Sequence, residues 1–60
     1  MERDNVRKLT GVAPLDFVDN IDWYSFRCLS YQKAIAINKK LKSNGYRSMI
    51  VDSVYICVYR

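Results

Sequence analysis

The last ten residues of this chain, VDSVYICVYR, place apolar side chains at almost every position of a strand-length segment. Three aliphatic residues take one set of alternate positions, and Tyr55, Cys57 and Tyr59 take the other. Successive residues of a strand point to opposite faces of a sheet, so such a strand has two apolar faces. The aliphatic face suits a core. The aromatic face must then be either a second core layer or a binding surface.

The longer segment RSMIVDSVYICVYR, residues 47–60, predicts a β-hairpin. Its turn would lie at residues 52–53, where Asp-Ser is a weaker turn signal than Asn-Gly. In this register Met49 and Val51 share the aliphatic side of the second strand, and Ile50 lies on its aromatic side.

Two further elements precede the hairpin. Residues 21–30, IDWYSFRCLS, are rich in aromatic residues and lack Gly and Pro, which predicts a strand. Residues 31–43, YQKAIAINKKLKS, predict a helix with Ser30 as its N-cap and Gly45 just beyond its end. The residues that recur at helical spacing and would face the core are Ala34, Ile37 and Leu41.

This order predicts a single small domain of the α+β class, in which a β-α-β-β body at residues 21–60 has one helix on a three-stranded sheet. Residues 1–20 would form a short helical or irregular arm, with a helix that Gly11 ends and a turn that opens at Pro14. The arm could instead fold over the aromatic face as a second core layer. The apolar residues of the arm that would cover the body are Leu15, Phe17 and Val18.

Charge is unevenly distributed along the 60 residues, whose formal net charge is +4. Residues 1–22 hold five acidic residues against three basic ones, whereas residues 23–60 hold seven basic residues against Asp52 alone. A basic body favours acidic partners, which are nucleic acid or an acidic protein surface. The N-terminal residues contain no apolar run that predicts a signal peptide or a membrane span, so we expect a cytoplasmic protein.

Residue chemistry argues against catalysis and against a metal or cofactor. The chain has no His and no G-x-S-x-G, P-loop or H-E-x-x-H motif. Cys28 and Cys57 are far apart in sequence, and we expect two reduced thiols, with Cys57 the more accessible; a single disulfide is the alternative. The spacing of three between acidic residues would align them on a helix, where a solvated acidic face is favoured over a divalent-metal site. These residues are Asp16, Asp19 and Asp22.

Aromatic and arginine side chains gather on the predicted sheet face that the helix leaves uncovered. Nucleic-acid modules stack bases on such surfaces, and protein interfaces concentrate Trp, Tyr and Arg. The predicted partner-binding residues are Trp23, Arg27, Tyr55, Tyr59 and Arg60.

Basic residues cluster on the predicted helix and the turn after it. They could contact phosphates or an acidic surface, although a solvated helix end carries the same residues. A nucleic-acid binder would combine its basic and aromatic residues on one surface, so their separation here favours a protein partner. The cluster consists of Lys33, Lys39, Lys40, Lys42 and Arg47.

The order of an aromatic strand, SYQKAIAINKKLKSNGY and a hairpin resembles the pattern of SPOR-type domains, in which a helix between strands closes on a Gly-aromatic pair. The resemblance begins at Trp23 and would imply binding to bacterial cell-wall glycan. The second βα repeat and an export signal are missing, so that function is not extended to this chain. In size and composition the chain also resembles small bacteriophage accessory proteins, which implies that it redirects one host macromolecule.

The sequence therefore predicts a non-catalytic interaction protein that modulates or inhibits a host or cellular protein through an open sheet face or an exposed strand edge. A small DNA- or RNA-binding protein is the alternative. Homodimerisation through the aromatic face is compatible with both.

Overall fold

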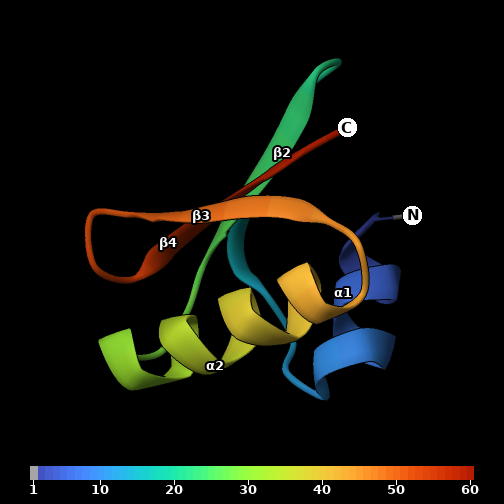
Figure 1. The fold of residues 1–60 in the computed structure, drawn as a ribbon. Coiled ribbons are helices and arrows are strands. Elements are labelled where there is room, and N and C mark those ends of the chain that lie inside the picture. Colours follow the sequence, from blue (N-terminus) through green and yellow to red (C-terminus); the bar gives the residue numbers. More distant parts are fainter. Residues whose placement is uncertain (1) are drawn as a thin grey trace.

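Four strands form one antiparallel sheet in the computed structural model, which describes residues 2–60 (Figure 1). The elements, in chain order, are α1 (Glu2–Thr10), β1 (Leu15–Asp19), β2 (Trp23–Arg27), α2 (Tyr31–Ser43), β3 (Arg47–Val51) and β4 (Tyr55–Tyr59). The strand order is β1-β2-β4-β3, so β1 and β3 are the edges. Both helices lie against the same face of the sheet (Figure 1). The α+β class is confirmed, but the sheet has four strands instead of the predicted three.

Helix α2 spans the predicted residues. The Ser30 hydroxyl oxygen accepts a hydrogen bond from the Lys33 backbone N–H at 3.2 Å, which makes it the N-cap. Beyond the helix, Gly45 has a φ of +85°, a left-handed conformation that suits glycine at a helix end. The three predicted core residues of α2 are all buried.

The hydrophobic core lies between the sheet and the two helices. Val6 of α1 is only 1% exposed, so α1 is part of the core. The division into an arm at residues 1–20 and a body at residues 21–60 does not match the structure, because α1 packs on α2 and β1 pairs with β2. The buried core residues are Val6, Tyr24, Phe26, Cys28, Ala34, Ile37, Leu41, Ile56 and Val58.

Strand β1 replaces the turn and the lid that the sequence predicted at residues 14–20. Its register with β2 shifts between Leu15 and Val18, and Asp16 has a φ of +47° at this irregularity. Phe17 does pack on the core, where its ring stacks on Tyr24 at 5.6 Å between centroids. Leu15 and Val18 instead pair with β2 residues of the other sheet face.

The hairpin between β3 and β4 is confirmed, but its predicted register is wrong by one residue. Asp52 and Ser53 both have positive φ, and the connection between the paired residues Val51 and Tyr55 is three residues long, one more than predicted. Val54 does not pair with Val51, because its carbonyl oxygen accepts a hydrogen bond from Cys28 N–H. Val51 therefore pairs with Tyr55, and every side chain of β3 changes face relative to the prediction.

Candidate binding face

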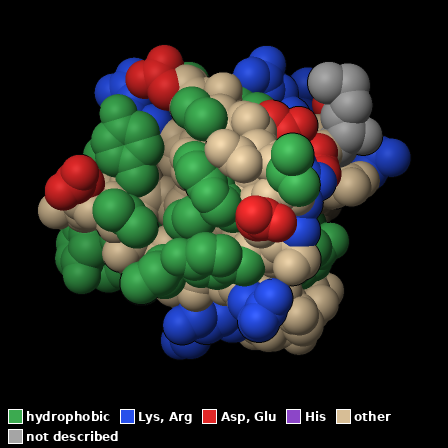
Figure 2. Space-filling view, turned by 90° about the horizontal axis from the view of Figure 1, so that it is seen from above, with side chains coloured by type: hydrophobic (Ala, Val, Ile, Leu, Met, Phe, Trp, Pro, Cys, Tyr) green, Lys and Arg blue, Asp and Glu red, His purple; other side chains and the backbone are tan. Residues whose placement is uncertain are grey.

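The sheet face opposite the helices is uncovered by any other part of residues 2–60, and we call it the open face (Figure 1). Figure 2 views the molecule from this side and shows hydrophobic side chains gathered over the sheet, with most of the charged ones toward the rim. The alternative in which the N-terminal residues cover the aromatic face is therefore wrong for the described chain. Alternation and strand pairing assign to the open face Leu15, Val18, Trp23, Ser25, Arg27, Arg47, Met49, Val51, Tyr55, Cys57 and Tyr59.

The middle of the open face holds a shallow apolar hollow of about 240 Å³. Trp23 of β2 and Tyr55 of β4 line it together with Val51 of the edge strand. Tyr55 and Val51 are 37% and 43% exposed, which is high for side chains of this type. The hollow is too open to enclose a small molecule, but an apolar side chain of a partner could fill it.

A second group of side chains lies around Tyr59, at the C-terminal end of β4. The Tyr59 hydroxyl donates a hydrogen bond to Met49 Sδ at 3.3 Å. A hydrogen bond with Cys57, and then the charge of that group, raise the pKa of the Tyr59 phenol. The hydrogen bond to Met49 Sδ uses the phenol as the donor.

Two arginines frame the open face at opposite ends. Arg27 of β2 lies opposite Tyr55 of β4 in the strand register. Its Nε lies 2.8 Å from Asp16 Oδ2, an ion pair without the alignment of a hydrogen bond. Arg47 pairs with Tyr59 and donates a hydrogen bond to the carbonyl oxygen of the last residue at 3.2 Å. Arg47, which the sequence grouped with the helix lysines, thus lies with the aromatic residues instead.

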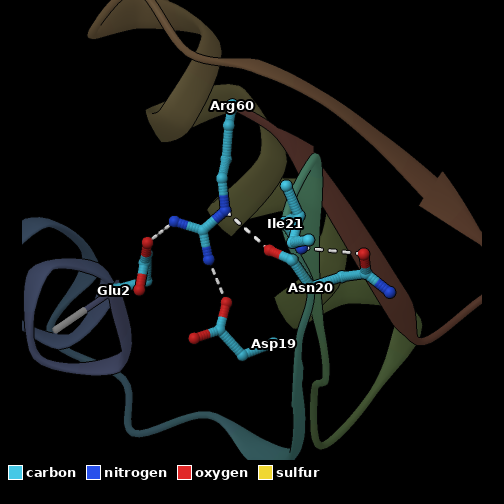
Figure 3. A network of polar contacts seen from close by, with 5 residues as sticks. All are labelled: Glu2, Asp19, Asn20, Ile21 and Arg60. Atoms are coloured by element: carbon cyan, nitrogen blue, oxygen red, sulfur yellow. Dashed lines mark hydrogen bonds and ion pairs between the residues drawn. The ribbon is translucent and has the colours of Figure 1, made fainter.

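Arg60 does not lie on the open face, because it follows Tyr59 and points to the opposite side (Figure 3). Its guanidinium group pairs with Glu2 of α1 and Asp19 of β1, and Nε donates a hydrogen bond to the Asn20 carbonyl oxygen at 2.9 Å. The same group lies 5.5 Å from the centroid of the Tyr24 ring. Arg60 therefore links the N-terminal helix α1 to the sheet through these contacts.

The four predicted basic residues of α2 lie on the helix layer, away from the aromatic residues. Lys33 and Lys40 line a groove of about 310 Å³ between α1 and α2. Asp16 and Asp19 lie on β1 rather than on a helix, and each pairs with an arginine. Within residues 2–60, no three Cys, Asp or Glu side chains are gathered closely enough to hold a metal ion.

The two cysteines lie on opposite faces of the sheet, so they do not form a disulfide with each other in this fold. Cys28 is 3% exposed and buried in the core, whereas Cys57 is half-buried on the open face. Burial raises the pKa of the Cys28 thiol. The predicted order of accessibility is confirmed.

Four apolar open-face residues were missed from the sequence, namely Leu15, Val18, Met49 and Val51. Met49 and Val51 were missed because the register places them with Cys57 and Tyr55. In RSMIV either set of alternate residues contains apolar side chains, so the pattern alone could not choose between the two faces. The pairing makes the apolar part of the open face wider than the sequence predicted.

Comparisons with protein-family models, with curated proteins and with solved structures found no match. Neither helix in the described part of the chain is long and apolar enough to cross a membrane.

Proposed function

We propose that this chain is a non-catalytic interaction protein that binds another protein through the open face and thereby modulates or inhibits it. The observation that carries the proposal is the uncovered apolar surface that spans all four strands. Its most exposed large side chains are Val18, Met49, Val51, Tyr55 and Tyr59. Monomeric proteins seldom expose a continuous apolar surface of this kind without using it.

The composition of the open face matches the centre of a protein interface. Tyr, Trp and Met are enriched at such centres, where they fill pockets and exclude water, and Arg is enriched around them. Trp23 and Tyr55 would be the anchors, because they flank the hollow. Arg27 and Arg47 would pair with carboxylates or carbonyl groups at the rim. The resemblance to small bacteriophage accessory proteins makes a host protein in the cytoplasm the first partner to test.

Nucleic acid is the second candidate, and the position of Arg47 beside Tyr59 favours it. Bases could stack on the aromatic residues while the arginine contacts a phosphate. The lysines that would strengthen such binding lie on the helix layer instead. This separation makes the protein partner the better supported of the two.

The test uses the protein as bait in extracts of its native host, with and without nuclease. Tyr55→Ala and Tyr59→Ala should abolish capture of the partner, because central aromatic anchors cost about 2 kcal/mol or more when truncated. Reversing the charges of Lys39, Lys40 and Lys42 is the matched control, and it should mainly slow association. The variants must first be shown to be folded by circular dichroism.

Direct titration with DNA and RNA oligonucleotides decides between the two candidates. The proposed protein partner would be overturned by one result: an affinity for oligonucleotides that falls steeply with salt, is lost in the lysine variant and survives Tyr55→Ala.

A further inference from the structure

The two edges of the sheet differ in how well they are protected against pairing with another strand. Edge β1 follows Pro14, has an irregular register and carries Asp16 and Asp19. Proline, irregularities and charges are the usual devices that prevent an edge from taking an additional strand. Edge β3 has a regular register with β4, and residues 48–51 contain no charge and no proline. Only β3 therefore presents an unprotected row of backbone N–H and C=O groups.

The flank of α2 beneath β3 also carries exposed apolar side chains, whereas Met49 and Val51 of β3 point to the open face. The Ser48 hydroxyl donates a hydrogen bond to Asn38 Oδ1 at 2.6 Å, which shows that this flank lies beneath the edge strand. Residues three or four apart share one flank of a helix, so Tyr31, Ile35 and Lys42 lie on it with Asn38. Tyr31 is 54% exposed and Ile35 is 43% exposed. The edge and this flank form one surface that is separate from the open face.

We propose that β3 pairs antiparallel with β3 of a second copy of this chain, so that two four-stranded sheets become one continuous sheet. This inference goes beyond the proposed function, because it uses the edge, the helix flank and Arg47 at the rim, and it leaves the proposed anchors Trp23 and Tyr55 uncovered. An antiparallel pair of identical strands has two-fold symmetry, which is the commonest symmetry of protein dimers.

Strand spacing brings the two α2 helices into contact in such a dimer. Helix α2 contacts β3 and, less extensively, β4, so it lies beneath these two strands. With strands about 4.8 Å apart, helices beneath equivalent strand pairs on each side of the new seam would be about 10 Å apart. This separation is at the upper end of the distance of about 8–10 Å at which helices pack. The edge pairing and the helix packing are therefore compatible.

The position of the two-fold axis places the exposed apolar residues in the seam. Asn38 of α2 lies beneath Ser48 of β3. One strand residue spans the length of about two helix residues, so a two-fold axis at Met49 crosses α2 about two residues before Asn38. Ile35 then lies close to the axis and packs across it. Tyr31 of each copy approaches Lys42 of the other, where a cation–π contact is available.

The charges at the two ends of β3 are complementary in this arrangement. Arg47 begins the strand and Asp52 follows its end. Antiparallel pairing centred on Met49 brings Arg47 of one copy beside Val51 and Asp52 of the other, twice by symmetry. Specific protein interfaces bury roughly 1,200–2,000 Å² of surface, and a pair of strand edges alone buries much less. The contact between the helices and these charge pairs would therefore be needed for a stable dimer.

Sedimentation equilibrium over a concentration series tests the dimer directly, and we expect a reversible monomer–dimer equilibrium. Ile35→Lys places a charge in the helix seam and should weaken the dimer about tenfold or more. Lysine suits a helix surface, so the variant should remain folded. Ile21→Lys is the matched control, because Ile21 is 87% exposed and precedes β2 on the protected side of the sheet. This control should dimerise as the unchanged protein does.

Charge reversal tests the antiparallel register. Arg47→Asp and Asp52→Arg should each weaken the dimer, and the double variant should recover it, which a structural effect on one copy would not do. In hydrogen exchange, β3 amides should gain protection as concentration rises, whereas β1 amides should not.

A protein that stays monomeric at every accessible concentration would overturn the inference. A monomer whose β3 amides become protected only when another protein is added would replace the second copy with a strand of that partner. A dimer that Ile35→Lys leaves unchanged and Tyr55→Ala dissociates would place the contact on the open face instead. Loss of the dimer in Ile35→Lys with partner capture retained separates this inference from the proposed function.

Discussion

The two faces of the sheet are built from alternate residues of the same strands, yet one is buried and the other is exposed. On the helix side, Ile56 and Val58 are fully buried. On the open face, their neighbours Tyr55 and Tyr59 are 37% and 42% exposed. Both sets of side chains are apolar, so hydrophobicity alone does not distinguish the core from the exposed face in this chain. The difference comes from the helices, which both pack on one side.

The largest contrast between the faces should appear in their contribution to stability. Phe26→Ala should lower the free energy of unfolding by about 3–5 kcal/mol, because Phe26 is 1% exposed and its loss leaves a cavity. A chain of 60 residues has roughly 3–9 kcal/mol in total, so this variant should be largely or partly unfolded. Tyr55→Ala should cost less than about 1 kcal/mol. Urea denaturation of both variants measures the difference, and equal losses would show that the open face is covered in solution.

The helix side could be predicted from the sequence because its signals are local. Ser30, the apolar spacing in residues 31–43 and Gly45 define α2 within one stretch of chain. Alternation in β2 likewise assigns Tyr24 and Phe26 to the core whatever their neighbours are.

The limits of the open face were less predictable because they depend on pairing between segments. Val54 bonds to Cys28 and shifts β3 by one residue, which no pattern within RSMIV reveals. In β1, the left-handed conformation of Asp16 breaks the alternation, so Leu15 and Val18 share a face although they are three residues apart. Arg60 could have been assigned correctly, since strict alternation from Tyr59 directs it to the helix side.

A second contrast concerns the arginines on the two faces. Arg60→Ala should lower the free energy of unfolding by about 1 kcal/mol, since it removes partly exposed ion pairs and a cation–π contact. Hydrogen exchange should become faster in α1, which Arg60 fastens to the sheet through Glu2. Arg27→Ala is the control on the open face, where the ion pair with Asp16 is exposed and should contribute close to nothing. Unchanged hydrogen exchange of the α1 amides would show that Arg60 does not hold α1 against the sheet.

In the turn between β3 and β4, one substitution should increase stability by a smaller amount. Ser53 has a φ of +64°, a conformation that costs a non-glycine residue about 1–2 kcal/mol. Ser53→Gly should remove this cost and add an entropic penalty of about 0.5–1 kcal/mol, so the net stabilisation should be about 0.5 kcal/mol. Ser25→Gly in β2, where φ is not positive, should instead be destabilising. Thermal unfolding of the two variants tests the sign, and a destabilised Ser53→Gly would argue against this turn.

The last prediction concerns Cys28, which is buried on the helix side of the sheet, and how stability depends on pH. Burial raises the pKa of Cys28 above its ordinary value of 9.0 and, as the main cause, that of Tyr24 above 10.0. Above about pH 9 the unfolded chain therefore loses protons that the folded chain retains, so the free energy of unfolding should fall as pH rises, and neither group should contribute to the pH dependence below that. Cys28→Ala should reduce the slope at its onset near pH 9, leaving the parts due to Tyr24 and to Tyr59, whose pKa is raised first by a hydrogen bond with Cys57. Urea denaturation between neutral pH and about pH 10 measures these slopes. The same alkaline slope in Cys28→Ala and in the unchanged protein would mean that the Cys28 thiol is accessible to water, and would remove the distinction between the two faces at this position.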